Sequence, residues 1–406
     1  MSAKFQIGID RFTLNSKLFL FTIMIISILP SGYVFGVPVK SILLLINLSV
    51  VILFFKKLSK NIVLFSMFLL LFLLLFLFFG VNDYGVMAVK EFQLMLIGIL
   101  LPYVYSYFFK THLSDVDFIN LYTISVFGLF FIKGILFFLG VSTSFGEMAF
   151  QFNRVFDNEL ITMELPFHLF RIYLPTDLLA SFYPFVYISV FGGSKRYRHE
   201  KVGYIYKVAL FASFLIVVLS FSRYIIFVSM AGFLFIILSG DKKITYMFII
   251  VVVCFFISFV FYDHIFEFIE LRLNSSANDA SDDIRFSQTN ILLDLFYDNP
   301  FFGNGIGAYS QKMIRSELTP FSYEQQVLSF LPKFGLIGAG VILFFLMAFS
   351  MQLIIKRRWS VFCVLVLFIL SGVFNPYLYS SNVMLIYLFI FIYGKRDFIY
   401  KRKYSF

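Results

Sequence analysis

Long runs of apolar residues recur along this chain of 406 residues and restrict how it can fold. One of them, 61 to 80, reads NIVLFSMFLLLFLLLFLFFG and contains no charged residue. A helix needs about 20 such residues to cross the roughly 30 Å of hydrocarbon in a bilayer. The chain is 60% hydrophobic, whereas water-soluble domains are only about half apolar. The sequence therefore predicts an all-α polytopic membrane protein, with residues 1–406 in a single integral membrane domain.

The apolar runs predict about twelve transmembrane helices. Two of these runs are separated only by Ser222 and Arg223, so the chain must reverse direction there within a very short turn. The predicted spans are 18 to 36, 38 to 55, 61 to 80, 88 to 109, 118 to 140, 175 to 192, 203 to 222, 224 to 239, 244 to 262, 328 to 352, 359 to 376 and 380 to 394.

Lys and Arg residues gather in alternate connections between these runs, which predicts that those connections are cytoplasmic. Both termini then lie on the cytoplasmic side. The net charge of +10 is spread over many short loops, so it indicates membrane anchoring and not nucleic-acid binding. The basic connections are KKLSK (56 to 60), KTH (110 to 112), SKRYRHEK (194 to 201), DKK (241 to 243), KRR (356 to 358) and the tail KRDFIYKRK.

Two larger polar connections fall on the opposite, periplasmic side: 141 to 174 and 263 to 327. We interpret the longer one as a hydrophilic loop that bears the active site. It contains GNGIG at 303 to 307, whose glycines fit either a turn or a close backbone approach to a ligand. The acidic cluster Asp279, Asp282 and Asp283 fits a solvated surface better than an ion site. The chain has no CxxC or HExxH pattern, so we expect neither a metal site nor another cofactor.

Three arginines lie at the predicted outer boundary of the membrane: Arg171, Arg223 and Arg285. An Arg deep in a bilayer costs about 2.5 to 3.5 kcal/mol, so such residues are usually paired or functional. The guanidinium group binds phosphate oxygens in a bidentate manner and stays charged. The three side chains would suit a lipid diphosphate, although each could also be structural or extend to the interface. Lys133 and Lys207 are further candidates for charges buried within the membrane.

Four segments together resemble the bacterial O-antigen ligase and polymerase superfamily, over roughly residues 165 to 395. That superfamily has an Arg before a Pro-containing helix start, a Ser-Arg at an outer helix end, an Arg ahead of D-N-P-x-x-G-x-G, and a polar residue leading into G-L-I-G. The matching segments are RIYLPTDLLA (171 to 180), SFSRYIIF (220 to 227), RFSQTNILLDLFYDNPFFGNGIGAY (285 to 309) and EQQVLSFLPKFGLIG (324 to 338).

The resemblance implies a GT-C-like membrane glycosyltransferase of the bacterial inner membrane. It would polymerise O-antigen or a related surface polysaccharide from undecaprenyl diphosphate-linked oligosaccharide, with membrane lipids and a chain-length regulator as partners. Ligases of this superfamily typically carry a His-Asn pair where this chain has Glu324 and Gln325, which favours the polymerase branch. Ligation of glycan to lipid A core and transport of a polysaccharide or lipid remain alternatives.

The chemistry of such a transfer assigns roles to individual residues. Arg171, Arg223 and Arg285 would bind the carrier diphosphate, and Arg223 and Arg285 would stabilise its developing charge. Glu324 is the candidate catalytic base. The remaining candidates are Asp177 and Asp294 as alternative bases and Tyr309 and Tyr323 as glycan-stacking residues.

Overall fold

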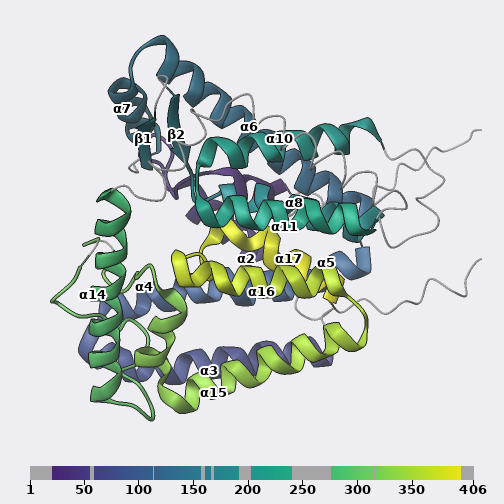
Figure 1. Ribbon diagram of the computed structural model, residues 1–406. Helices are drawn as coiled ribbons and strands as arrows, with labels where there is room; N and C mark the ends of the chain where they lie inside the picture. Colours follow the sequence, from purple (N-terminus) through teal and green to yellow (C-terminus); the bar gives the residue numbers. More distant parts are fainter. Residues whose placement is uncertain are drawn as a thin grey trace, which may run out of the picture.

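The computed structural model describes residues 21–54, 59–112, 114–156, 161–165, 169–191, 203–239, 276–314, 316–317 and 319–394. They form mainly α-helices, with one two-stranded antiparallel sheet (Figure 1). The elements are α2 (Val39–Phe54), α3 (Lys60–Tyr84), α4 (Val86–Met95), η2 (Leu96–Leu100), α5 (Leu101–His112), α6 (Asp115–Ser142), α7 (Phe145–Phe156), β1 (Ile161–Leu165), β2 (Leu169–Tyr173), α8 (Asp177–Phe191), α10 (Tyr204–Ser220), α11 (Arg223–Ser239), α14 (Ser276–Asp298), α15 (Gln326–Ile355), α16 (Trp359–Phe374), η4 (Ser381–Val383) and α17 (Met384–Gly394).

Four of the described helices are long and apolar enough to cross a membrane: Lys60–Tyr84, Val86–Tyr107, Val116–Ser142 and Gln326–Ile355. Several shorter apolar helices accompany them. The prediction of a mostly helical membrane protein is confirmed, and the small sheet is the departure from an all-α fold. The expected span at 244 to 262 lies outside the described residues, so the number twelve stays a prediction.

The reversal predicted at Ser222 is present. Helix α10 ends at Ser220 and α11 begins at Arg223, and Phe221 between them has a positive φ of 45°. A single left-handed residue lets the backbone turn sharply. The turn therefore places Arg223 at the first position of a helix.

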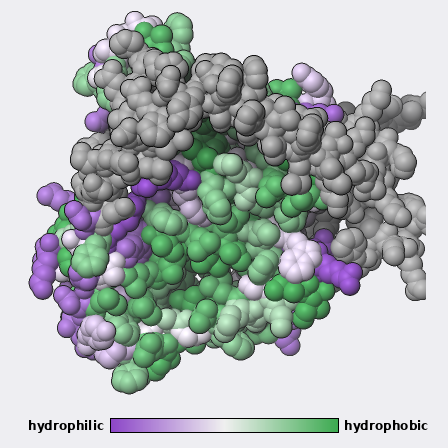
Figure 2. All heavy atoms as spheres, in the orientation of Figure 1, coloured by the Kyte–Doolittle hydropathy of each residue, from purple (hydrophilic) through white to green (hydrophobic). Residues whose placement is uncertain are grey.

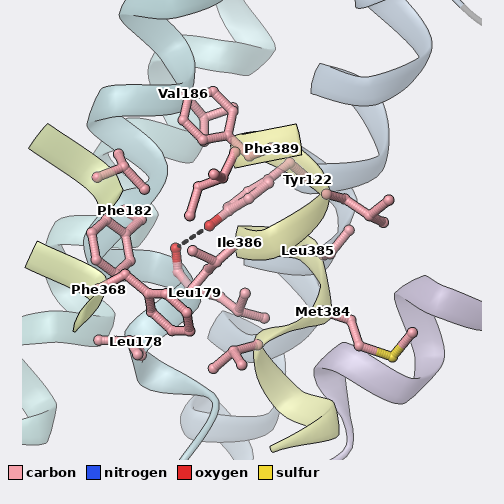
Figure 3. Packing of buried hydrophobic residues seen from close by; sticks show 14 of the residues in the cluster. Tyr122, Leu178, Leu179, Phe182, Val186, Phe368, Met384, Leu385, Ile386 and Phe389 are labelled. Carbon is pink, nitrogen blue, oxygen red and sulfur yellow. Dashed lines mark hydrogen bonds between the residues drawn. The ribbon is translucent and has the colours of Figure 1, made fainter. Parts of the chain in front are cut away.

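Helix α8 forms the centre of the bundle, and most of its residues are buried. Apart from Asp177 at its start, it is largely apolar around its circumference, as expected for a helix surrounded by others. Phe182 of α8 meets Phe368 of α16 edge to face, with ring centroids 6.4 Å apart (Figure 3). On α6, the Tyr122 hydroxyl donates a hydrogen bond of 2.9 Å to the Leu179 carbonyl. This core fixes the helices that carry the outer elements.

The polar elements lie together at one end of the bundle. Helices α7 and α14, the β1–β2 hairpin and the α10–α11 turn occupy the left side of Figure 1. Hydrophilic residues gather at the same end over α14 (Figure 2), while hydrophobic residues cover the adjacent face of the helices. Met148 and Phe152 of α7 pack on Leu136 of α6 and Ile172 of β2, which anchors the hairpin to the bundle.

The two polar connections contain regular structure. The segment 141 to 174 includes α7 and the hairpin, in which Ile161 pairs with Tyr173. Within the predicted loop 263 to 327, residues Ser276–Asp298 form the helix α14, and the periplasmic location of the loop stays a prediction. The acidic residues Asp279, Asp282 and Asp283 lie on this helix, and the helix ends directly before Asn299 and Pro300, as expected from the restriction that Pro places on the preceding residue.

Candidate functional site

Helix α14 contacts the start of α15 through one face. Arg285, Gln288 and Thr289 stand at helical spacings of three and four residues and so point to the same side. The Arg285 Nε atom lies 3.0 Å from the Glu324 Oε2 atom, and the Glu324 backbone N–H donates to the Gln288 side-chain oxygen over 3.1 Å. Gln325 accepts a bond from the Thr289 hydroxyl and donates one to the Arg285 carbonyl. This contact places Glu324 and Gln325 against α14.

The predicted base and one predicted diphosphate ligand thus form an ion pair. The side chains of Arg285 and Glu324 are 26% and 16% exposed, so the pair remains open to its surroundings. The 3.0 Å contact is made by the Arg285 Nε atom. Glu324 is therefore the counter-ion of Arg285, and an anion that bound Arg285 would compete with it.

Arg171 and Arg223 lie close together at the α10–α11 turn. The Arg171 Nε atom donates a 3.0 Å hydrogen bond to the Ser220 carbonyl at the end of α10, and its guanidinium lies 5.1 Å from the Tyr173 ring centroid. Burial lowers the pKa of Arg171, and the positive charge of Arg223 lowers it further, while Tyr173 and Asp177 oppose this. Arg171 therefore lies within electrostatic range of Arg223.

Tyr173 is influenced by charges on both sides of the polar end of the bundle. Burial raises the pKa of Tyr173, and the charges of Asp177 and Glu324 raise it further, whereas Arg171 lowers it. Glu324 is thus within electrostatic range of the hairpin that carries Arg171. The structure gathers the three arginines and Glu324 at the polar end of the bundle.

The two candidate stacking tyrosines differ in exposure. The Tyr309 ring is half-buried against Tyr84, with centroids 5.5 Å apart. Tyr323 is only 2% exposed, and its hydroxyl accepts a 2.9 Å hydrogen bond from the Ser310 backbone. Burial also raises the pKa of Tyr323. Tyr323 fixes the connection between α14 and α15, and its ring has little free surface for a sugar.

The alternative bases lie in different environments. Asp177 and Lys133 are fully buried and form an ion pair of 2.8 Å between α8 and α6. Lys133 also donates to the Ile216 carbonyl of α10, so this pair joins three helices. The prediction of a buried charge is confirmed for Lys133 and wrong for Lys207, which is exposed. Asp294 is exposed on α14.

The glycine segment 303 to 307 does not offer its backbone to a ligand. The N–H groups of Gly303, Asn304 and Gly305 donate to the carbonyls of Asn299, Pro332 and Lys333, respectively. The next two N–H groups donate to the Phe76 carbonyl and the Glu91 carboxylate. Since protein acceptors use all five donors, the turn interpretation holds and a phosphate cradle does not. Among the described residues, no group of three His, Cys, Asp or Glu side chains could hold a metal ion.

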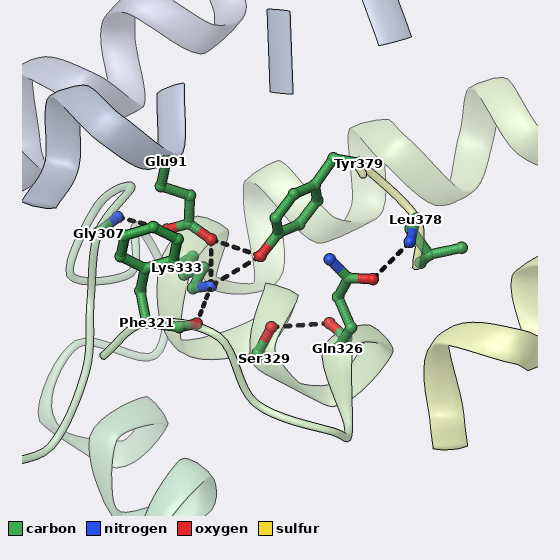
Figure 4. Close-up of polar contacts among 8 residues, drawn as sticks. All are labelled: Glu91, Gly307, Phe321, Gln326, Ser329, Lys333, Leu378 and Tyr379. Atoms are coloured by element: carbon green, nitrogen blue, oxygen red, sulfur yellow. Dashed lines mark hydrogen bonds and ion pairs between the residues drawn. The ribbon is translucent and has the colours of Figure 1, made fainter. Parts of the chain in front are cut away.

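A second buried ion pair escaped the sequence analysis. Glu91 of α4 and Lys333 of α15 are fully buried with 2.5 Å between Oε1 and Nζ, and the Tyr379 hydroxyl donates to the same Glu91 oxygen (Figure 4). Burial raises the pKa of Tyr379, and Glu91 adds to this effect. Both charges lie within predicted apolar spans, where ionisable residues are costly. The high cost of ionisable residues in apolar spans could have identified Glu91 and Lys333 as candidates from the sequence.

Comparison with known proteins supports the resemblance seen in the sequence. Residues 208–343 match the family model described as O-antigen ligase. The match includes Arg223, Arg285 and Glu324, the glycine segment and the broken start of α15, while Arg171 lies outside it. No curated protein sequence matches the chain. The resemblance to the O-antigen ligase and polymerase superfamily is confirmed over residues 208–343.

Proposed function

We propose that this protein polymerises O-antigen or related surface polysaccharide repeat units. It transfers the growing glycan from undecaprenyl diphosphate to a new carrier-linked repeat unit. The observation that carries this proposal is the gathering of Arg171, Arg223 and the Arg285–Glu324 pair at the polar end of a membrane bundle. The match to an O-antigen ligase family over 208–343 supports the same reaction class.

The reaction requires one bond to form and one to break. A hydroxyl oxygen of the acceptor sugar attacks the anomeric carbon of the donor glycan, and the bond from that carbon to the diphosphate oxygen breaks. The diphosphate leaves on its lipid with the bonding electrons. Arginines held beside it stabilise this charge, and removing one such interaction typically costs about 3 to 4 kcal/mol.

Glu324 takes the proton from the acceptor hydroxyl in this proposal. In the structure, its carboxylate binds Arg285. A diphosphate that binds the Arg285 guanidinium would weaken this pair and leave the carboxylate to accept a proton. Binding of the donor would thereby prepare the base, and the acceptor hydroxyl would react only when a donor is present.

The proposed location is the inner membrane of a bacterium. Both termini lie in the cytoplasm, and the end with α14 faces the periplasm, where lipid-linked repeat units are polymerised. A chain-length regulator is the proposed protein partner. Ligation of glycan to lipid A core is the second candidate because the matching family is described as a ligase; Glu324 and Gln325 in place of His-Asn favour the polymerase.

A gene deletion separates the two reactions by their products. A cell without its polymerase still ligates single repeat units, so we expect core with one repeat on a lipopolysaccharide gel and no long-chain ladder. Complementation with the intact gene should restore the ladder. Bare core after the deletion would establish the ligase instead.

A further inference from the structure

The connection between α14 and α15 must hold Glu324 opposite Arg285. One buried lysine, Lys333, contacts this connection both near its beginning and near its end. The Lys333 ammonium donates 3.2 Å to the Phe321 carbonyl, close before Glu324 in the chain. It also binds Glu91, whose other oxygen accepts the Gly307 N–H over 2.7 Å. Figure 4 shows these contacts converging on Lys333 from α4, from the connection and from the turn before η4.

The backbone of Lys333 contributes to the same arrangement. Helix α15 breaks at Gly335, which has a φ of 59°, and the break leaves the Lys333 carbonyl to accept the Gly305 N–H over 3.0 Å. Lys333 therefore binds the beginning of the connection through its carbonyl and the end through its ammonium. Its three N–H donors face Glu91, Phe321 and, at 3.5 Å, Tyr379, so the buried charge is fully satisfied.

We infer that Lys333 and Glu91 are positioning residues for Glu324. Neither touches the reacting atoms. They fix the connection 299 to 325 so that Glu324 meets Arg285, and this role rests on the proposed function of that pair. Misplacing a reacting group by about 1 Å can slow a reaction about 100-fold.

A double variant separates positioning from simple charge pairing. Lys333→Met alone leaves Glu91 buried without its partner, so we expect poor folding. Glu91→Gln together with Lys333→Met removes both charges, and we expect recovered yield and thermal stability. Met cannot donate to the Phe321 carbonyl, so kcat should remain about 10- to 100-fold low, with little change in KM. The assay uses the purified full chain in nanodiscs and lipid-linked repeat units extracted from the deletion strain.

Trypsin cleavage at Lys312 reports the connection directly, because this exposed residue lies within it. We expect faster cleavage in the double variant, and a smaller increase with a smaller loss of kcat in Tyr379→Phe, which keeps both charges. The matched control is Lys133→Met with Asp177→Asn, which removes the other fully buried pair and should leave cleavage at Lys312 unchanged.

Wild-type kcat in the double variant, or unchanged cleavage at Lys312 in both the double variant and Tyr379→Phe, would overturn the inference. The cleavage measurement does not depend on which reaction the protein catalyses. If the deletion leaves bare core, the proposed polymerase function fails, while the Lys312 result still decides whether Lys333 holds the connection.

Discussion

At the scale of single residues, exposure distinguishes three ion pairs among the residues that the structure describes. Lys133–Asp177 and Glu91–Lys333 are fully buried, and removing one partner of such a pair costs about 3 to 5 kcal/mol. An exposed pair contributes only about 0 to 1 kcal/mol. Arg285–Glu324 is partly exposed and lies between these limits. Of the three, it is the pair that a substrate could open.

The arginines provide a test of diphosphate binding. Lys keeps the positive charge but loses the planar bidentate fork. We expect Arg223→Lys and Arg285→Lys each to lower kcat/KM about 10- to 1000-fold, measured on lipid-linked repeat units at matched protein levels. Lys312→Arg in the exposed connection is the control and should retain activity. Full activity of both Lys variants would exclude the diphosphate role.

Glu324 can be tested by removing its charge alone. Glu324→Gln keeps the size of the side chain and an oxygen that can accept from Arg285, but it cannot act as the base. We expect a loss of about 100- to 10,000-fold in kcat and a band of one repeat on the lipopolysaccharide gel. Asp294→Asn, on the exposed side of α14, should retain the ladder. A normal ladder from Glu324→Gln would place the base elsewhere.

At the scale of elements, the break in α15 explains the glycine segment. Beyond Gly335, the N–H groups of Leu336 and Ile337 donate to the carbonyls of Pro300 and Phe301. In turn, N–H groups of the glycine segment donate hydrogen bonds to the carbonyls of Pro332 and Lys333, which precede the break. Such close backbone contact requires glycine: a Cβ on Gly305 would lie 2.2 Å from the Gly80 nitrogen. The sequence D-N-P-F-F-G-N-G therefore completes a broken membrane helix.

A glycine substitution tests this interpretation. Gly305→Ala places a methyl group against the α3 backbone at a φ of 85°, and we expect a loss of about 2 to 4 kcal/mol in stability. Thermal denaturation in detergent, followed by size-exclusion chromatography, measures it. Gly340→Ala on α15 is the matched control because no atom lies within 4 Å of its added Cβ. Equal stability of the two variants would contradict the packing role.

At the scale of the whole molecule, the polar end with α14 and a basic turn lie at opposite ends of the bundle. The α15–α16 turn with Lys356 and Arg357 lies at the end opposite α14 (Figure 1). Basic residues favour the cytoplasmic side, which supports the proposed periplasmic orientation of the candidate site. With the proposed orientation, ATP and nucleotide sugars would be absent from the side of the site, in agreement with the proposed substrate, which carries its own diphosphate leaving group.

Reporter fusions test this orientation. A fusion after Arg358 should be active as a cytoplasmic reporter, and one near Ser281 on α14 should be active as a periplasmic reporter. A fusion after Lys243, in a segment outside the described residues, should also be cytoplasmic. A cytoplasmic signal from the Ser281 fusion would overturn the assignment of the site to the periplasm.

The sequence by itself determined the membrane class, the turn at Ser222 and the polar segments between the apolar runs. Each of these depends on neighbouring residues: hydropathy summed over about 20 positions decides membrane insertion, and loop charge decides orientation. The resemblance of 285 to 338 to the superfamily also rests on residues close in the chain.

Only the tertiary structure decided which charges meet. Glu91 and Lys333 are 242 residues apart in the chain, and hydropathy places each in an apolar span without naming its partner. The pairing of Arg285 with Glu324 depends on α14 being a helix, which a polar, acidic segment did not indicate. Such contacts depend on which helices become neighbours. That choice follows from side-chain packing across the whole bundle, which no local pattern of residues contains.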